Sequence, residues 1–424
     1  MATRRRAIVH IGTPKTGSTS IQKFLIEHRR ELLAAGFCYP TSPGMRNHTA
    51  LPAYGAGEGY SGNVVRRAGG SGDGGSIAAR LERALAKEVG NLPEHVHTVL
   101  FSSEQLATRL DEVASVERLK QLLAPLFEEI RIVVYLRRQD EAAVSRYSTA
   151  LRAGGETSFA LLPPPGEEGR LYDLAAILDR YGAVFGPDAI TPRIFERSRL
   201  VAGDVVRDFL EVCGIRGIEP GEQPPTRNPA LRADVQELVR RFNAAVEQRA
   251  LKDRPRIGVY LRDGRYHGKA RQPTQAEARE FYQRFAEGNE RIRARYFPDQ
   301  PTLFAEDFSR YPEAEDADAV ADGRVLGTAV DVLVEVAEAL RSAEVEMLYL
   351  YGRQAEQAGR IGEARRNYAK AVRTERGHKR AKKGLQRLEA LEAKAPEAVV
   401  EAPRHKRTPE ERAAEKAARK RQRK

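Results

Sequence analysis

The sequence has only two cysteines, Cys38 and Cys213, among 424 residues, and no long apolar run. Two cysteines cannot form a disulfide framework, so nothing in the chain calls for an oxidising compartment. A membrane helix needs about 18 to 20 consecutive apolar residues. The basic start, Met1–Arg6, is not followed by the apolar run of a signal peptide. These absences argue against the membrane and secreted classes, and we expect a cytoplasmic protein.

Positive charge is in excess, but much of it lies at one end of the chain. The formal net charge is +12, and residues 404–424 contain ten Lys/Arg and three Glu. This tail has no aromatic side chain to stack on bases, so we expect no specific nucleic-acid binding. We expect residues 393–424 to be a disordered, solvated tail. The alternative is non-specific association with an anionic surface, either nucleic acid or membrane.

Strand-like and helix-like segments alternate along the first three quarters of the chain. Short apolar runs at 7–11, 98–101, 130–136 and 190–195 read as strands, and helical periodicity follows them. This alternation predicts an α/β fold, a parallel sheet flanked by helices, with a phosphate-loop-like anion site after the first strand. We assign this domain to residues 1–312. An acidic, apolar-poor linker follows at 313–324.

The segment 325–392 is expected to form a small all-α region. An amphipathic helix over 325–340 would place Val330, Leu333, Val334, Ala337 and Leu340 on one side. The next residues resemble a single tetratricopeptide unit, in which small and large side chains interlock two antiparallel helices. They are Leu348, Gly352, Ala355, Gly359, Ala364, Tyr368 and Ala371. The alternative is an ordinary helical hairpin. Either form could dock a protein partner.

The loop after the first strand suits an anion. It runs from Gly12 to Thr19 and leads into a helix, whose first N–H groups and dipole attract negative charge. The glycine spacing matches an ATP-binding Walker loop, but the position of the Walker lysine holds Ser18. Lys15 lies two residues before Gly17 instead. This difference argues against an ordinary ATPase, GTPase or nucleotide kinase.

A second anion site is predicted after the strand at 130–136. Arg137 follows this strand directly, and Ser145 comes eight residues later in a predicted helix. A guanidinium and a hydroxyl at this spacing can hold a phosphate. Both loops would lie at the carboxyl edge of one parallel sheet, where ligands of open α/β sheets bind. Two anion sites on one edge suggest a nucleotide phosphorylated at two positions.

The segments HIGTPKTGSTS and LRRQDEAAVSRY together resemble the paired phosphate loops of sulfotransferases that use 3′-phosphoadenosine-5′-phosphosulfate (PAPS). The resemblance extends over residues 7 to about 310. It implies a PAPS-dependent transferase that releases adenosine 3′,5′-bisphosphate and needs no metal. The second loop departs from the family pattern, because Arg137-Arg138-Gln139 replaces the usual Arg-Asn-Pro. Arg138 could therefore be a second phosphate contact or a surface residue.

The resemblance also implies roles for individual residues. The residues expected around the 5′-phosphosulfate are Lys15, Thr16, Gly17, Ser18, Thr19 and Ser20. Arg137 and Ser145 would hold the 3′-phosphate, and Lys15 would also be catalytic. The family uses Glu or His as general base, so Glu104, just past the strand at 98–101, is the first candidate. His48 is the second. Glu104 could instead cap a helix, His48 could be an ordinary loop histidine, and His10 is expected to be packed.

The acceptor is less well defined by the sequence. The glycine-rich segment 42–76 and the basic loop Arg262–Arg271 could line a cleft. We expect a hydroxyl-bearing acceptor, on a carbohydrate. Two alternatives to a sulfotransferase stay open at this stage: a nucleotide kinase, and a non-catalytic adaptor that acts through its helical carboxy-terminal region.

Overall fold

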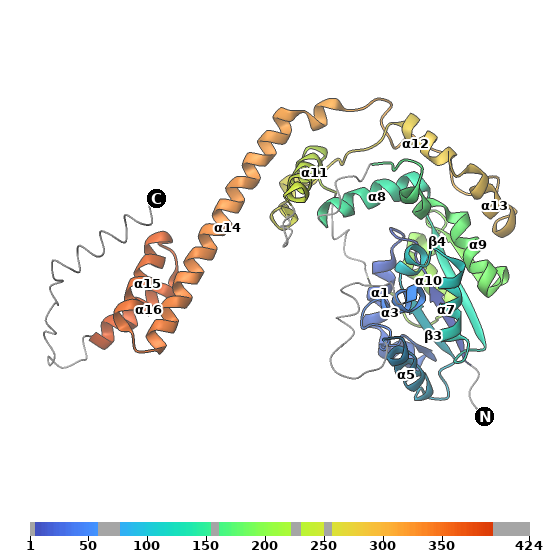
Figure 1. Ribbon diagram of the computed structural model, residues 1–424, viewed down its shortest axis with the longest axis horizontal. Helices are drawn as coiled ribbons and strands as arrows, with labels where there is room; N and C mark the ends of the chain where they lie inside the picture. Colours follow the sequence, from blue (N-terminus) through green and yellow to red (C-terminus); the bar gives the residue numbers. More distant parts are fainter. Residues whose placement is uncertain (1–4, 58–76, 154–160, 222–229, 250–256, 393–424) are drawn as a thin grey trace. The chain divides into compact units, whose positions relative to one another are not determined.

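The computed structural model describes residues 5–57, 77–153, 161–221, 230–249 and 257–392. Within these residues the chain forms a five-stranded, all-parallel sheet with the order β2-β3-β1-β4-β5 (Figure 1). The strands are β1 (Arg6–His10), β2 (Phe37–Cys38), β3 (Thr98–Ser102), β4 (Glu129–Leu136) and β5 (Ile190–Ile194). The predicted α/β fold, a parallel sheet flanked by helices with a helical carboxy-terminal region, is confirmed. The two-residue edge strand β2 was not predicted.

Helices cover both faces of the sheet. The helices in this part of the chain are α1 (Ser18–Glu27), α2 (Arg29–Ala34), α3 (Ala50–Ala56), α5 (Ile77–Gly90), α6 (Gln105–Arg109), α7 (Val113–Leu123), α8 (Gln139–Arg152), α9 (Leu174–Phe185), α10 (Val205–Cys213), α11 (Ala233–Gln248), α12 (Gln275–Gln283) and α13 (Ala286–Tyr296). Side chains alternate between faces along each strand. Val9 and Val134 therefore pack with α7 and α9, whereas Ile8 and Tyr135 pack with α1 and α10.

The chain divides into two compact units, Met1–Val330 and Asp331–Lys424. The division falls inside the long helix α14 (Asp322–Gln357) and not in the predicted linker, 313–324. That linker segment contains a short 3-10 helix at Ala317–Val320 and an ion pair of 3.2 Å between Glu315 and Arg271. Ion pairs and helical turns of this kind attach the segment to the first unit.

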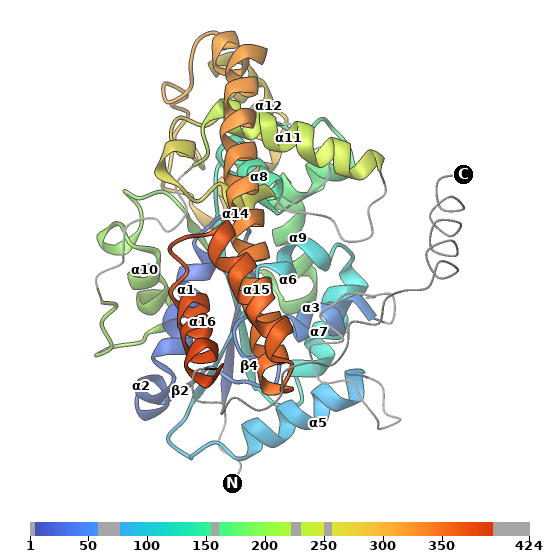
Figure 2. The same cartoon turned by 90° about the vertical axis from the view of Figure 1, so that its left-hand side faces the viewer.

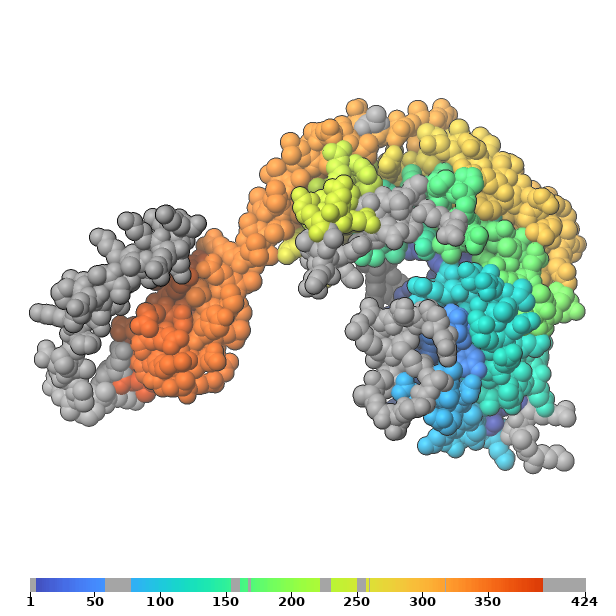
Figure 3. Space-filling view, viewed as in Figure 1, coloured from blue at the N-terminus to red at the C-terminus, as the bar shows by residue number. Residues whose placement is uncertain are grey.

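The second unit is described here by itself. The second half of α14 packs with α15 (Ile361–Thr374) and α16 (Lys379–Glu392), as Figures 2 and 3 show in orange to red. Tyr368 lies at the centre and is fully buried. A Cβ atom at Gly352 or Gly384 would come within 2.6 Å of the Tyr368 ring, so both positions need glycine. The interlocking of small and large residues expected for 348–371 is present, and the tetratricopeptide assignment stays a prediction.

The amphipathic helix expected over 325–340 lies within α14. Val330, Leu333, Val334 and Leu340 are exposed. The residues of α14 that pack with α15 and α16 begin at Val345. The predicted basic tail, 393–424, and the part 58–76 of the glycine-rich segment lie outside the described residues. No helix in the described part of the chain is long and apolar enough to cross a membrane.

Candidate active site

Pairing between β1 and β4 continues beyond the end of β1 and places the two predicted loops side by side. The Ile11 N–H donates to the Val133 carbonyl at 3.0 Å, and the Thr13 N–H donates to the Tyr135 carbonyl at 3.1 Å. The Tyr135 N–H donates in return to the Gly12 carbonyl at 2.7 Å. Because the first loop is held along β4, it lies beside the residues that follow β4.

Two glycines of the first loop are required by close contacts. Gly12 has φ +104°, and a Cβ there would lie 3.0 Å from the Cα atom of Glu104. Gly17 has φ +79°, and a Cβ there would lie 2.7 Å from a methyl group of Val205. Both positions combine a left-handed backbone with a close neighbour, which only glycine tolerates without strain. The two glycines thus allow the first loop to pack closely against the residue after β3 and against helix α10.

Lys15 reaches across the site to helix α8. Its Nζ donates a hydrogen bond of 2.8 Å to Thr149 Oγ1, and its backbone carbonyl accepts one of 3.0 Å from Arg137 Nη1. Burial lowers the pKa of the Lys15 ammonium, the charges of Arg137 and Arg152 lower it further, and the charge of Glu104 raises it. Lys15 therefore lies where positive groups gather, with one carboxylate close enough to affect its pKa.

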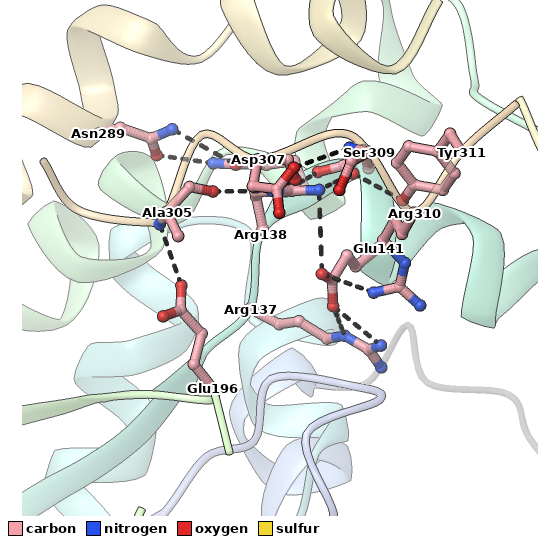
Figure 4. A network of polar contacts seen from close by, with 12 residues as sticks. Arg137, Arg138, Glu141, Glu196, Asn289, Ala305, Asp307, Ser309, Arg310 and Tyr311 are labelled. Carbon is pink, nitrogen blue, oxygen red and sulfur yellow. Dashed lines mark hydrogen bonds and ion pairs between the residues drawn. The ribbon is translucent and has the colours of Figure 1, made fainter. Parts of the chain in front are cut away.

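Arg137 contacts the first loop directly. Besides its bond to Lys15, its Nε and Nη2 donate to Glu141 Oε2 at 3.3 and 3.2 Å (Figure 4). Burial alone would raise the pKa of Glu141, but the charges of Arg137 and then Arg310 lower it overall. Ser145 lies one turn before Thr149 on α8, and its carbonyl accepts a hydrogen bond from Thr149 Oγ1. The structure thus brings Lys15 and Arg137 into contact, and Ser145 touches, through its backbone carbonyl, the Thr149 hydroxyl that Lys15 binds.

The hydroxyl groups of the first loop point in different directions. Thr16 is buried, and its Oγ1 donates to the Thr13 carbonyl at 2.5 Å. Ser18 is also buried, and its Oγ lies 3.5 Å from the same carbonyl. Thr19 is exposed and Ser20 is half-buried. In this arrangement Thr16 and Ser18 stabilise the turn with their side chains, so their N–H groups are the parts that can face an anion.

Glu104 lies beside the first loop, after strand β3. It occupies the residue before α6, but its side chain makes no capping hydrogen bond, so the alternative role as a helix cap is not observed. Its Oε2 accepts a hydrogen bond of 3.2 Å from Gln22 Nε2 on α1. Gln22 also donates to Ser102 Oγ at 3.2 Å. Glu104 is therefore a half-buried carboxylate held from α1 next to Lys15 and Gly12.

His48 has a different environment from Glu104. It is fully buried, and it stacks on Tyr39 with ring centroids 4.3 Å apart. Its Nε2 is 3.0 Å from the Pro40 carbonyl, and its Nδ1 accepts from the Ser102 N–H at 3.3 Å. Both nitrogens are thus engaged in the neutral tautomer that carries its proton on Nε2. A buried imidazole bonded on both sides has no nitrogen to offer an acceptor, so we do not keep His48 as a candidate base.

His10 is packed, as expected. It is fully buried between the rings of Tyr135 and Phe209, and its Nδ1 is 2.8 Å from Ser102 Oγ. Burial lowers the pKa of His10 to about 3 and that of His48 to about 3. Both side chains are therefore neutral in the folded protein down to acid pH.

The two buried histidines make folding stability depend on pH. An unfolded histidine titrates near pH 6.5, so below that pH the unfolded chain binds protons that the folded chain excludes. Stability is then fully present above pH 6.5 and falls as the pH decreases toward 3, by about 1.4 kcal/mol per pH unit and histidine. We expect urea unfolding midpoints to fall between pH 6.5 and 5, above the main titration range of carboxylates. His48→Gln should reduce the slope, and the exposed-site control His95→Gln should not. A constant midpoint in the wild type would contradict this.

Arg138 is not a surface residue, although it lines the larger of the two cavities near Arg137. It is 5% exposed and forms a bidentate pair with the fully buried Asp140, with N–O distances of 2.8 and 2.9 Å. Its Nη1 donates to the carbonyls of Ala305 and Asp307 at 2.7 and 2.6 Å. Tyr311 Oη donates to Asp140 at 2.6 Å. Arg138 therefore fastens residues 305–311 to the start of α8, which is a structural role.

Arg137 lines one cavity of this region, and its contact residues Glu141 and Phe195 line a second. One lies between the loops, has a volume of about 20 Å³ and is lined by residues that include Thr13, Lys15 and Arg146. A cavity of that size holds about one water molecule. The other has a volume of about 540 Å³, and its lining includes Glu141, Phe195 and Arg310. This volume is in the range of small-molecule sites. No three His, Cys, Asp or Glu side chains of the described residues are grouped as metal ligands.

Two polar residues of this site were missed by sequence reasoning. Thr149 is four residues after Ser145, so helical spacing from Ser145 places both on one face of α8. Gln22 is four residues after Ser18 and faces β3 in the same way. Both could have been found by counting one helical turn, four residues, onward from a residue already assigned to the anion site. The basic loop Arg262–Arg271 packs on the start of α11, where the Ala233 N–H donates to the Lys269 carbonyl at 3.0 Å, and Lys269 and Arg271 line a cavity beside it.

No family model matches this chain. An uncharacterized protein of Archaeoglobus fulgidus is 29% identical over 170 residues, which are 39% of this chain and 46% of that protein. The match therefore covers less than half of that relative. A solved structure of a sulfotransferase from Alicyclobacillus acidocaldarius is similar with a TM-score of 0.32 and 18% identity, over 53% of this chain and 88% of that one. These similarities are too remote to assign an activity.

Proposed function

We propose that the protein is a sulfotransferase that moves a sulfuryl group from PAPS to an acceptor hydroxyl, on a carbohydrate. The observation that carries the proposal is the meeting of the two loops at the carboxyl edge of the sheet. The Arg137 guanidinium donates to the Lys15 carbonyl, and Ser145 lies one turn before Thr149, the residue of α8 that Lys15 contacts. A donor with phosphates at both ends of one nucleoside fits two cationic groups on neighbouring strands, and a single-phosphate ligand needs only one of them.

Lys15 acts on the leaving group in this proposal. The acceptor oxygen forms a bond to sulfur while the bond from sulfur to the bridging oxygen breaks, and adenosine 3′,5′-bisphosphate leaves with the electron pair. Negative charge develops on that bridging oxygen. An ammonium placed there stabilises the transition state more than the ground state. Lys15 Nζ, which is bonded to the uncharged Thr149 hydroxyl, can exchange this bond for one to the donor.

Arg137 and Ser145 hold the 3′-phosphate in this proposal. The guanidinium is already paired with Glu141, so a phosphate has to replace or share that carboxylate. Arginine has five N–H donors in a planar fork, and the bonds to Glu141 and Lys15 leave donors for a phosphate. The adjacent 540 Å³ cavity, which contains Phe195, is the space in which we place the nucleoside.

Glu104 is the proposed general base. It receives the proton from the acceptor hydroxyl as the oxygen attacks sulfur. Gln22 donates to one of its oxygens, which fixes the orientation of the carboxylate beside the first loop. Strand β1 lies between β3 and β4 in the sheet. Along the edge of the sheet, the loop with Lys15 therefore lies between Glu104, which follows β3, and Arg137, which follows β4.

Arg137→Ala is expected to weaken the binding of adenosine 3′,5′-bisphosphate about 10- to 100-fold, because a hydrogen-bonded charge contributes about 1.5–3 kcal/mol. The measurement is isothermal titration calorimetry on the full chain. A matched control is Arg131→Ala, an exposed arginine near the opposite end of β4, which should leave the affinity unchanged. Equal affinities for the Arg137 variant and the wild type would count against the assigned phosphate site.

The activity itself is tested by transfer of radiolabelled sulfate from PAPS to a panel of saccharides. The proposal is supported if a saccharide becomes labelled with PAPS as the donor. It should not become labelled when labelled inorganic sulfate replaces PAPS. Thermal shifts add a separate test of the donor. Stabilisation by adenosine 3′,5′-bisphosphate but not by ATP with Mg²⁺ is expected, and the opposite preference would indicate a kinase.

A further inference from the structure

Helix α14 carries a row of exposed apolar side chains within the second unit. Leu333, Leu340, Met347 and Tyr351 are 66%, 64%, 50% and 52% exposed. They lie beside, and not within, the face of α14 that packs on α15 and α16, which consists of Val345, Leu348, Tyr349 and Ala355. Large aliphatic side chains exposed in a row on one helix are unusual for a monomer and mark an interaction surface.

The spacing of the row is that of a coiled coil. Leu333, Leu340 and Met347 are seven residues apart, and Ala337, Glu344 and Tyr351 repeat at the same interval between them. Apolar residues that recur at alternating steps of four and three define the a and d positions of a heptad. With Leu333 at d, the only charged residue in the row is Glu344, at an a position. A heptad row fits another helix of the same period, and a second copy of α14 has that period.

The charged position determines how two copies can pair. In a parallel pair each a residue faces its counterpart, so two Glu344 carboxylates would meet in the apolar seam, which is unfavourable. In an antiparallel pair, a residues face d residues of the other helix. Glu344 would then lie opposite Leu340 of the second copy and beside its Arg341, and Leu333 would face Tyr351. Two arginines and two glutamates would meet around the symmetry axis, so their charges are complementary.

We propose that two copies of the chain pair through α14 in an antiparallel, two-fold symmetric coiled coil formed by the row from Leu333 to Tyr351. Such an interface is isologous, because the same row of residues from each copy forms it. Arg341 already donates to the Thr374 carbonyl at 2.6 Å, and Glu344 is 3.4 Å from Lys370. These contacts turn the Glu344 carboxylate, within the seam, and the Arg341 guanidinium, beside the seam, toward α15.

The first test measures the mass of the full chain in solution by sedimentation equilibrium. We expect twice the chain mass of 47.2 kDa at tens of micromolar for the wild type. The double variant Leu333→Glu with Leu340→Glu should raise the dissociation constant at least about 100-fold, since it removes two apolar contacts and places charges in the seam. Ala339→Glu adds a charge to an exposed position on the far side of α14 and should leave the mass unchanged. A monomeric wild type, or a double variant that still forms dimers as tightly, would overturn the proposal.

The second test determines orientation by disulfide cross-linking under mild oxidation. Chains with Leu340→Cys are mixed with chains with Glu344→Cys. Antiparallel pairing predicts a covalent dimer in the mixture and none with either variant alone. A covalent dimer from one variant alone would indicate a parallel pair, and no cross-link in any sample would indicate that α14 does not pair with itself; both results contradict the proposal. Cys38 and Cys213 are buried and unpaired, and the unsubstituted chain measures their background.

Discussion

Lys15→Ala is expected to lower kcat for sulfuryl transfer about 100- to 1,000-fold, the usual effect of removing one group that stabilises developing negative charge. The reason is positional. Lys15 Nζ extends from the first loop into the site and donates a hydrogen bond to the neutral Thr149 hydroxyl. The measurement is the initial rate at saturating PAPS.

The matched control is Lys23→Ala, which removes an exposed lysine of α1 whose ammonium is 3.6 Å from Glu27. This variant should retain the wild-type kcat. A Lys15 variant that keeps full turnover, or that changes KM alone, would show that Lys15 does not act on the leaving group.

Glu104→Gln is the second large effect, with an expected loss of about 100- to 10,000-fold in kcat, the range for removal of a general base. Glutamine keeps the shape of the side chain but cannot accept the proton of the acceptor hydroxyl. The affinity for adenosine 3′,5′-bisphosphate should not change, because Glu104 follows β3 and the phosphate contacts are on the loops after β1 and β4.

The pH profile gives an independent reading for Glu104. Because Glu104 takes the acceptor proton in the wild type and glutamine cannot, the pH dependence of the rate should differ between the wild type and the variant. Glu117→Gln, at an exposed position of α7, is the control and should behave as the wild type. A Glu104 variant with near wild-type rates would remove this residue from the mechanism.

The sequence predicted the parts of the site that depend on strand ends. Lys15 lies in the loop after one apolar run and Arg137 directly follows another, and the carboxyl ends of parallel strands meet at one edge. Their proximity therefore followed from the fold class alone. Glu104 was predicted by the same reasoning. Its alternative as a capping residue could be settled only by the direction of its side chain, which depends on Gln22 in α1.

Other features depend on contacts between distant segments. Arg138 is buried by its bonds to Ala305 and Asp307, which are more than 160 residues away. Nothing in the local sequence distinguishes such an arginine from a phosphate ligand. His48 lies in a segment that reads as a surface loop, yet Tyr39 and Phe101 enclose it. The sequence predicted an apolar side of α14, but amphipathic spacing does not show whether a partner covers that side.

The position of the lysine in the first loop distinguishes the kinase alternative from the sulfotransferase. Ser18 occupies the place of the Walker lysine, and its buried hydroxyl is directed to the Thr13 carbonyl. The lysine of this loop lies at position 15 and contacts α8. This geometry favours a donor that extends from the first loop toward Arg137.

The central claim is that one donor molecule engages both loops, and calorimetric titration of adenosine 3′,5′-bisphosphate tests it most directly. The account predicts one site per chain in the wild type, with weaker binding in both Lys15→Ala and Arg137→Ala. It also predicts that adenosine 5′-monophosphate, which lacks the 3′-phosphate, binds more weakly to the wild type and is insensitive to Arg137→Ala. If the bisphosphate and the monophosphate bind equally well, or if Arg137→Ala affects both alike, the two loops do not share one donor.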